Sequence, residues 1–136
     1  MIKTTQTEIV RRFVDEVWNR GKSEAIASFT APEFIDRAYD PRNSEGHRNA
    51  VEALKSIIPD ALWTIDSLAA AGNVVIAELT MRGTHRAMFR GVAPQGNAVE
   101  VRCYRTFVFS GELLVEHSAL LDTDRLLKQM AETKTD

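Results

Sequence analysis

Three polar side chains in the last third of the sequence are the first candidates for acid/base chemistry. In the segment ELLVEHSALL, residues 112–121, His117 falls in a row of otherwise apolar residues, and Asp122 follows the segment directly. Arg105 is the one cation in an apolar row of the preceding segment, AVEVRCYRTFVF. A cation among apolar neighbours needs a carboxylate, a ligand or water. We therefore predict that His117 and Asp122 are catalytic and that Arg105 binds the substrate.

Each of these residues also has a structural interpretation. The sequence DTDRLL is a standard helix start, in which Asp122 would cap the first turn. Arg105 could pair with Glu78 or Asp66 across the sheet, and His117 could be a core histidine with a single hydrogen bond. Both interpretations stay open from the residues alone.

Other residues extend the possible pocket. His85 continues an apolar row at the end of its segment, where it would line the pocket or lie exposed. Trp18 and Trp63 are most simply core residues, and they would also form an apolar pocket wall. No His-x-x-x-His or paired-carboxylate spacing supports a metal site for any of the three histidines.

The composition is that of an ordinary globular protein. The 136 residues are 44% hydrophobic, and 17 basic against 19 acidic side chains give a net charge of -2. This balance favours neither a nucleic acid nor an anionic membrane as partner. The single cysteine, Cys103, excludes an internal disulfide. Without a signal-peptide core or an apolar run of about 18 residues, we expect one cytoplasmic domain over residues 1–136.

Three predicted helices precede most of the strands and one follows them, over residues 9–18, 23–29, 44–58 and 122–130. The first has an apolar residue at every third or fourth position from Ile9 to Trp18 and ends near Gly21. Ser44 is the expected N-cap of the third helix, and Pro59 ends it.

Alternation of apolar and polar residues predicts five strands, over residues 33–39, 61–70, 73–87, 98–109 and 112–121. Helices first and strands afterwards indicate an α+β fold, with the helices packed on the concave face of a strongly curved sheet. Such a sheet leaves a cavity at its open end, and the polar groups on its inward rows would face a ligand there. These inward groups are His85, Arg105 and His117.

Five segments, in this order and spacing, resemble the SnoaL-like polyketide cyclases within the nuclear-transport-factor-like superfamily. They are FVDEVWNRG, APEFID, IPDALWTIDSLAAAGNVV, GTHRAMFRGVAPQGNAVEV and GELLVEHSALLDTDRLLKQM. The resemblance implies a cone-shaped α+β fold, a cystatin-like roll with a mixed or antiparallel sheet, and a homodimer formed through the outer face of the sheet. It also implies chemistry with no cofactor and no metal.

In characterised members of that family, a pocket carboxylate is understood to act as acid and base on an activated carbon of a polyketide. A histidine and other polar groups hold the oxygens. By position, the resemblance covers His117 and Asp122 of this chain. Asp66 and Asp36 also match family positions, and we predict Asp66 to bind substrate, although both fit plain surface or turn acids as well.

Two departures from the family pattern bear on the chemistry. Where members commonly read EHWD, this chain reads EHSA, so that Ser118 replaces the tryptophan and Ala119 the acid. Ala119 shares the strand face of His117, so the missing carboxylate is the one expected inside the pocket. Arg37 stands where a histidine is often found, and we predict that it binds an enolate or carboxylate of the substrate.

Three functions follow from these observations. The first is a cofactor-free cyclase, isomerase or hydrolase-like enzyme acting on a small, mostly apolar carbonyl compound. The second is a non-catalytic protein that binds a small hydrophobic molecule, because Ala119 and Arg37 stand where an acid and a histidine are expected. The third is a dimeric interaction module with a vestigial pocket.

Overall fold

The computed structural model describes residues 5–133. Its helical segments are α1 (Gln6–Phe13), the π-helical η1 (Val14–Asn19), the 3₁₀ turn η2 (Ser23–Ala25), α2 (Ile26–Phe29), α3 (Ser44–Ile57) and α4 (Thr123–Ala131). Its strands are β1 (Thr30–Asp36), β2 (Leu62–Ala71), β3 (Val74–Thr84), β4 (Ala98–Ser110) and β5 (Leu113–Leu121). Among residues 5–133, no helix is both long enough and apolar enough to cross a membrane.

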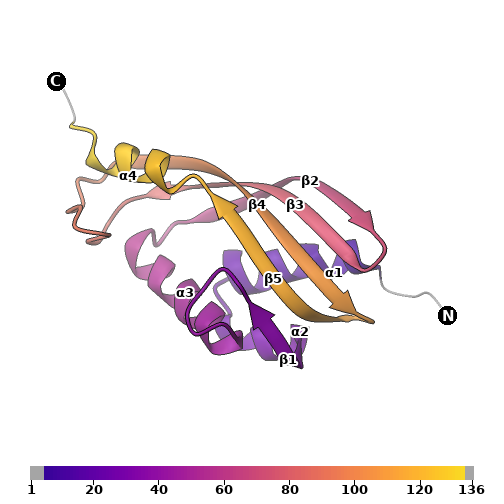
Figure 1. The fold of residues 1–136 in the computed structure, drawn as a ribbon. Coiled ribbons are helices and arrows are strands. Elements are labelled where there is room, and N and C mark those ends of the chain that lie inside the picture. The colour runs from indigo at the N-terminus through magenta and orange to yellow at the C-terminus, as the bar shows by residue number, and fades with distance from the viewer. Residues whose placement is uncertain (1–4, 134–136) are drawn as a thin grey trace.

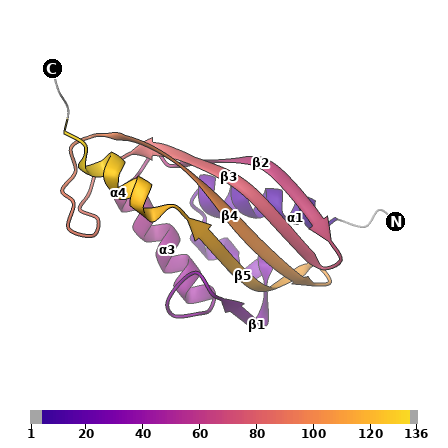
Figure 2. The same ribbon diagram turned by 45° about the horizontal axis from the view of Figure 1, so that its top comes forward.

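The five strands form one open, mixed sheet in the order β1-β5-β4-β3-β2. Neighbours from β2 to β5 are antiparallel, whereas β1 runs parallel to β5 at one edge. Figures 1 and 2 show α1 and α3 on the same side of the sheet, with α4 beyond the end of β5. The predicted α+β architecture, with helices on one face of the sheet, is therefore confirmed.

Strand alternation decides which side chains reach the core. In β4 the buried residues alternate strictly with more exposed ones, and the buried row includes Cys103, Arg105 and Phe107. Arg105 is therefore on the inner face, as the sequence predicts. Its Cα partner on β5 is Ala119, and that of Phe107 is His117, so both β5 residues also belong to the inner face.

An irregularity near the start of β5 changes the expected inner row. The register shifts between Val108 and Phe109, so Phe109 pairs with Leu114 on β5. Leu114 is buried and Leu113 is 39% exposed, the reverse of what uniform alternation predicts. A bulge inserts one unpaired residue and moves the flanking residues to the opposite face. Alternation is regular again from His117 onward.

Element ends differ from the prediction at the two places that shape the site. β1 runs from Thr30 to Asp36, so Tyr39 lies in the following loop instead of in a strand. The N-cap of α3 is Asn43 and not Ser44, because the Asn43 side chain accepts the Gly46 backbone N–H at 3.1 Å. A Cβ at Gly46 would lie 1.8 Å from the Pro41 carbonyl oxygen, so only glycine lets this loop approach α3.

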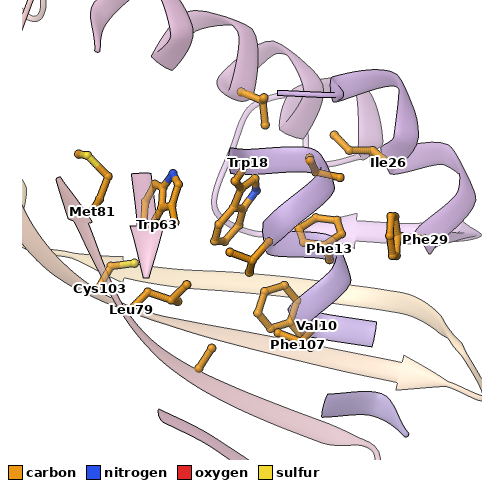
Figure 3. Close-up of a cluster of buried hydrophobic side chains, with 14 of the residues drawn as sticks. Val10, Phe13, Trp18, Ile26, Phe29, Trp63, Leu79, Met81, Cys103 and Phe107 are labelled. Atoms are coloured by element: carbon orange, nitrogen blue, oxygen red, sulfur yellow. The ribbon is translucent and has the colours of Figure 1, made fainter. Parts of the chain in front are cut away.

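The first helix changes its winding before it ends. α1 continues into the π-helical segment η1, which carries Trp18 and Asn19. The Asn19 side chain accepts the Trp63 backbone N–H at 2.7 Å and donates to the Trp63 carbonyl at 2.9 Å, which ties η1 to β2. Figure 3 shows Trp18 and Trp63 side by side, and their ring centroids are 4.9 Å apart. Single π-helical turns often occur at functional sites.

Candidate active site

Asp36, the last residue of β1, is at the centre of a buried polar cluster. Its side chain is 0% exposed. One carboxylate oxygen lies 2.7 Å from His47 Nδ1, and the other lies 3.1 Å from His117 Nδ1 and accepts the Ala38 backbone N–H at 2.9 Å. Both histidines are 1% exposed. The hydrogen bonds to two buried imidazoles offset the free-energy cost of removing this carboxylate from water.

The fold brings these three residues together from distant parts of the chain. Parallel pairing of β1 with β5 makes Asp36 and His117 direct Cα partners. The Arg37 backbone N–H donates to the His117 carbonyl at 2.8 Å, which continues this pairing past the end of β1. His47 is in the first turn of α3, which packs against β1.

Trp18 fixes the position of the proton on His47. The indole Nε1–H donates to His47 Nε2 at 2.9 Å, so this nitrogen carries the lone pair. The proton of neutral His47 is therefore on Nδ1, where it is donated to Asp36. A chain of hydrogen bonds thus runs from Trp18 through His47 to the carboxylate, and each member has its partner.

His117 completes the chain on the other side of Asp36, but with one nitrogen left over. Its Nδ1–H donates to Asp36, so the lone pair of the neutral ring is on Nε2. This Nε2 is buried and has no hydrogen-bond partner within residues 5–133. A buried, oriented lone pair without a partner is free to accept a proton or hydrogen bond from a ligand.

The charges of the cluster follow from its burial and hydrogen bonds. Burial by itself would raise the pKa of Asp36, but the hydrogen bonds from His117 and His47 outweigh it and hold the pKa well below 3.8. Burial lowers the pKa of His117 to about 4 against the opposing effect of Asp36, and the charge of Arg105 adds to the lowering. Burial likewise lowers the pKa of His47. At neutral pH, Asp36 is therefore ionised and both histidines are neutral.

Arg105 lies next to this cluster, in an aromatic cage. Its guanidinium carbon is 4.8 Å from the ring centroid of Trp18, 5.2 Å from that of Trp63 and 5.9 Å from that of Tyr39. One Nη1–H donates to the Tyr39 hydroxyl at 2.9 Å, and Nε lies 3.4 Å from Cys103 Sγ. Cation–π contacts and a hydroxyl compensate part of the cost of burying this charge.

A small pocket adjoins the same aromatic side chains. It has a volume of about 50 Å³ and lies between η1, α3 and the start of β2. Its walls include Trp18, Tyr39 and Trp63, together with apolar residues of α3 such as Val51 and Leu54. Trp18 and Tyr39 therefore border both the pocket and the buried polar cluster.

The cluster has the residue types of a metal site, but the proton on His47 is in the wrong place for metal binding. Single nitrogen or oxygen atoms of Asp36, His47 and His117 lie within 4.8 Å of one another. A histidine binds a metal through a lone pair, and the Trp18 hydrogen bond leaves the lone pair of His47 on Nε2, away from the other two residues. The hydrogen-bonded arrangement therefore uses His47 Nδ1 as a proton donor and not as a metal ligand.

The stability of the fold is expected to fall in acid because of these histidines. As the pH drops, unfolded His117 gains a proton near pH 6.5, whereas folded His117 gains one only near pH 4. The unfolded state thus binds more protons in this window, and the free energy of unfolding should fall by about 3 kcal/mol between pH 7 and 4 from His117 alone. His47 acts in the same direction.

Urea unfolding of the wild type and of His117→Asn at several pH values measures this effect. Asparagine does not titrate and keeps an N–H donor toward Asp36, so the variant should lose less stability in acid than the wild type. Equal losses in both proteins would show that His117 is not held neutral by the fold.

Four of the predicted site residues come together in this region. His117 belongs to the hydrogen-bonded chain, and Arg105 is next to it with Trp18 and Trp63. The expected pairing of Arg105 with Glu78 or Asp66 is absent. Glu78 is on the outer face, where it pairs with Arg102, and the exposed Asp66 accepts the Thr80 hydroxyl at 2.6 Å.

The other predicted residues lie elsewhere. Asp122 is exposed, and its side chain accepts the Arg125 backbone N–H at 3.0 Å as the N-cap of α4. Arg37 is exposed and pairs with Glu116. His85 is fully buried, but within residues 5–133 neither of its ring nitrogens has a hydrogen-bond partner.

Three residues of this region, two in the cluster and one beside Arg105, were not assigned to the site from the sequence. Asp36 fits a surface or turn acid as well as a pocket acid, and nothing in FID separates the two. His47 had a usable signal, because it lies four residues before Val51 and therefore begins the inward stripe of α3. Tyr39 is in an irregular loop, for which neither helical nor strand periodicity applies.

Comparisons with known proteins agree with this architecture. A family model described as SnoaL-like polyketide cyclase matches residues 8–130. A candidate polyketide cyclase from Acidithiobacillus ferrooxidans is 25% identical with a TM-score of 0.81, and the match covers 96% of each chain. A candidate SnoaL-like polyketide cyclase from Jannaschia sp. CCS1 is 20% identical with a TM-score of 0.85, covering 98% of this chain and 96% of the other.

A third solved structure carries a different description. AclR, a candidate hydroxylase from Streptomyces galilaeus, is 22% identical with a TM-score of 0.82, and the match covers 95% of this chain and 97% of AclR. A search of curated proteins finds no match. At 25% identity or less, these structures show that the fold is shared, and the chemistry depends on the residues of this chain.

Proposed function

Since this chain belongs to the SnoaL-like polyketide cyclase family, we propose that it is a cofactor-independent enzyme that moves a proton on a small, mostly apolar carbonyl compound. The observation that carries the proposal is the free Nε2 of His117, which is buried and has no partner within residues 5–133. A polar atom left unsatisfied in a native interior needs an explanation, and a bound substrate provides one.

His117 is the proposed general base. Its Nε2 lone pair takes a proton from a carbon next to a carbonyl group, and the electrons of the C–H bond move to the carbonyl oxygen to give an enolate. Returning the proton from His117 to another atom completes an isomerisation. Alternatively, the enolate carbon attacks a second carbonyl in the same molecule and closes a ring, and the resulting alkoxide takes the proton back from His117. Neither outcome consumes an oxidant or a reductant.

Asp36 acts through His117 as a positioning residue. It holds the imidazole through the Nδ1–H, so that the lone pair points away from the carboxylate. It also stabilises the imidazolium that forms when Nε2 is protonated. In this arrangement the carboxylate itself never meets the substrate, because both of its oxygens are occupied by the two histidines and the Ala38 N–H.

This division of roles accounts for Ala119. The family pattern places an acid there as the proton-transfer group, and this chain has a methyl group. A histidine supported by a second carboxylate can do the same work, since proton transfer requires a correctly placed lone pair and not a particular residue type. The proposed site therefore replaces the missing acid with His117 and its partner Asp36.

The low basicity of His117 limits the class of substrate that it can deprotonate. A base whose pKa is about 4 in the free protein is weak, so it can deprotonate only a carbon whose C–H is already acidic. A carbon between two carbonyl groups has this property. The aromatic walls formed by Trp18, Tyr39 and Trp63 suit a flat, apolar molecule. We therefore assign the protein a 1,3-dicarbonyl substrate.

Deuterium exchange tests the function without knowledge of the natural substrate. Ethyl 2-methylacetoacetate has one hydrogen between its two carbonyl groups, and exchange in D₂O converts its methyl doublet to a singlet in the proton NMR spectrum. The wild-type protein is expected to accelerate this exchange in proportion to its concentration, with the rate falling as the pH drops through about 4, where His117 gains a proton.

Two results would count against an enzyme. No acceleration over buffer by folded protein, across a set of 1,3-dicarbonyl compounds, would remove the proposed proton transfer. Binding of such compounds with thermal stabilisation but without exchange would instead indicate a non-catalytic binding protein, the second function considered from the sequence.

A further inference from the structure

The buried guanidinium of Arg105 has unused binding capacity. The side chain is 4% exposed. Of the five N–H groups of an arginine, one faces Cys103 Sγ and one the Tyr39 hydroxyl. For the remaining three, no acceptor and no carboxylate lies within bonding distance among residues 5–133. An arginine buried without a carboxylate is costly, and it binds planar anions well.

The position facing Arg105 on the neighbouring strand offers no acceptor. Arg105 and Ala119 are direct Cα partners in the β4–β5 ladder. Side chains at such positions are close enough to interact, so an aspartate at 119 could pair with the guanidinium. The methyl group of Ala119 leaves the space next to Arg105 without a negative charge.

The other buried charge of the cluster does not fill this role. Asp36 is ionised, but its oxygens are already bound by His47, His117 and Ala38. Arg105 and Asp36 are also the only buried residues within 5–133 with a permanent charge. The arginine therefore keeps one edge of its guanidinium free inside the site.

We infer that the substrate carries a carboxylate and that this group binds the free edge of Arg105. The inference rests on the proposed function, since it takes the bound molecule to be the substrate of His117. Arg105 and His117 point to the same face of adjacent strands, with Ala119 opposite the arginine and Phe107 opposite the histidine. A carboxylate on Arg105 would therefore hold the molecule on the strand face that also carries His117.

The aromatic cage supports an apolar body attached to that carboxylate. The guanidinium lies over Trp18 and Trp63, which also form walls of the adjoining pocket. Figure 3 shows these two rings side by side within the buried hydrophobic cluster. They are the only tryptophans of the chain, so intrinsic fluorescence reports directly on this part of the site.

Paired ligands of equal shape test the inference. Benzoate and benzamide have the same ring and nearly the same size, but only benzoate is an anion. We expect tryptophan fluorescence titrations to show benzoate binding at least about tenfold more tightly than benzamide. The reason is that a hydrogen bond between a charged donor and a charged acceptor is stronger than one with a neutral partner. Equal affinity, or tighter binding of benzamide, would overturn the inference.

Variants locate the binding site. Ala119→Asp supplies an internal carboxylate opposite Arg105, and it should weaken benzoate at least about tenfold while leaving benzamide nearly unchanged. Ala119→Asn has the same size without the charge, and it should keep the preference. If Ala119→Asp left benzoate affinity unchanged, Arg105 would not be the anion site.

Removal of the arginine gives a second measurement. Arg105→Gln should abolish the preference for benzoate, whereas Arg102→Gln, on the outer face of the same strand, should not. If Arg105→Gln does not fold, the two Ala119 variants decide the question. Exchange of the neutral ester without a benzoate preference would refute only the anion site, and a benzoate preference without exchange would refute only the enzyme.

Discussion

His117→Asn is expected to lower the rate of protein-catalysed deuterium exchange by about 10²–10⁴-fold, the usual contribution of a general base. Asparagine retains an N–H near the position of Nδ1, so the hydrogen bond to Asp36 is preserved while the reacting Nε2 is removed. The fold should therefore survive with a modest loss of stability from the smaller side chain. NMR-monitored exchange and thermal unfolding, measured on the same preparation, separate the two effects.

His85→Asn is the matched control. His85 is as deeply buried as His117 and also lacks hydrogen-bond partners for its ring nitrogens within residues 5–133, but it lies outside the hydrogen-bonded cluster. The same substitution there should lower stability without lowering the exchange rate. If both variants lost exchange equally, the loss would reflect general damage to the fold, and His117 would not be the base.

Asp36→Asn is expected to destabilise the fold by about 3–5 kcal/mol, although it only replaces one carboxylate oxygen by an NH₂ group. The amide has one acceptor oxygen in place of two, whereas His47 and His117 both present an Nδ1–H. One of the two histidines must therefore face an N–H donor. The buried negative charge is lost as well, which leaves Arg105 as the only buried residue with a permanent charge within residues 5–133.

The destabilisation by Asp36→Asn depends on the hydrogen bond from Trp18 to His47. His47 could accept from the new amide only by moving its proton to Nε2, where it would meet the indole N–H. Trp18→Phe removes that conflict, so it should cost less stability in the Asp36→Asn background than in the wild type. A double-mutant cycle by urea unfolding measures the difference. Additive losses would contradict the assigned proton positions.

Asp66→Asn is the control for the loss of a carboxylate. Asp66 is exposed and accepts a hydrogen bond from Thr80, which an amide oxygen can also accept. Its replacement should change the free energy of unfolding by much less than that of Asp36. Similar losses at the two positions would mean that burial of Asp36 carries no special cost.

Much of the fold could be predicted from local patterns. The positions of the helices and strands follow from apolar spacing of three to four or of two, because each element must bury one face. The same alternation placed Arg105, His117 and Ala119 on the inner face of the sheet, and the ladder confirms all three. The N-cap role of Asp122, open from the sequence, follows from its contact with the Arg125 N–H.

The centre of the site could not be predicted in this way. Asp36 meets His117 because β1 pairs in parallel with β5, and the strand spacing within either segment contains no information about that partner. It meets His47 because the loop after β1 folds back against α3 at Gly46. Periodicity shows that a side chain points inward, but an inward acid becomes a buried charge or a surface group according to which element covers it.

The sequence by itself determined the elements, the inward rows and the absence of an acid at Ala119, because these depend on the order of neighbouring residues. Only the tertiary structure decided which polar groups share the interior. Asp36, His47 and His117 form a cluster through contacts between residues up to 81 positions apart. Burial there sets their charges, since the cost of removing a charge from water depends on its surroundings and not on its residue type.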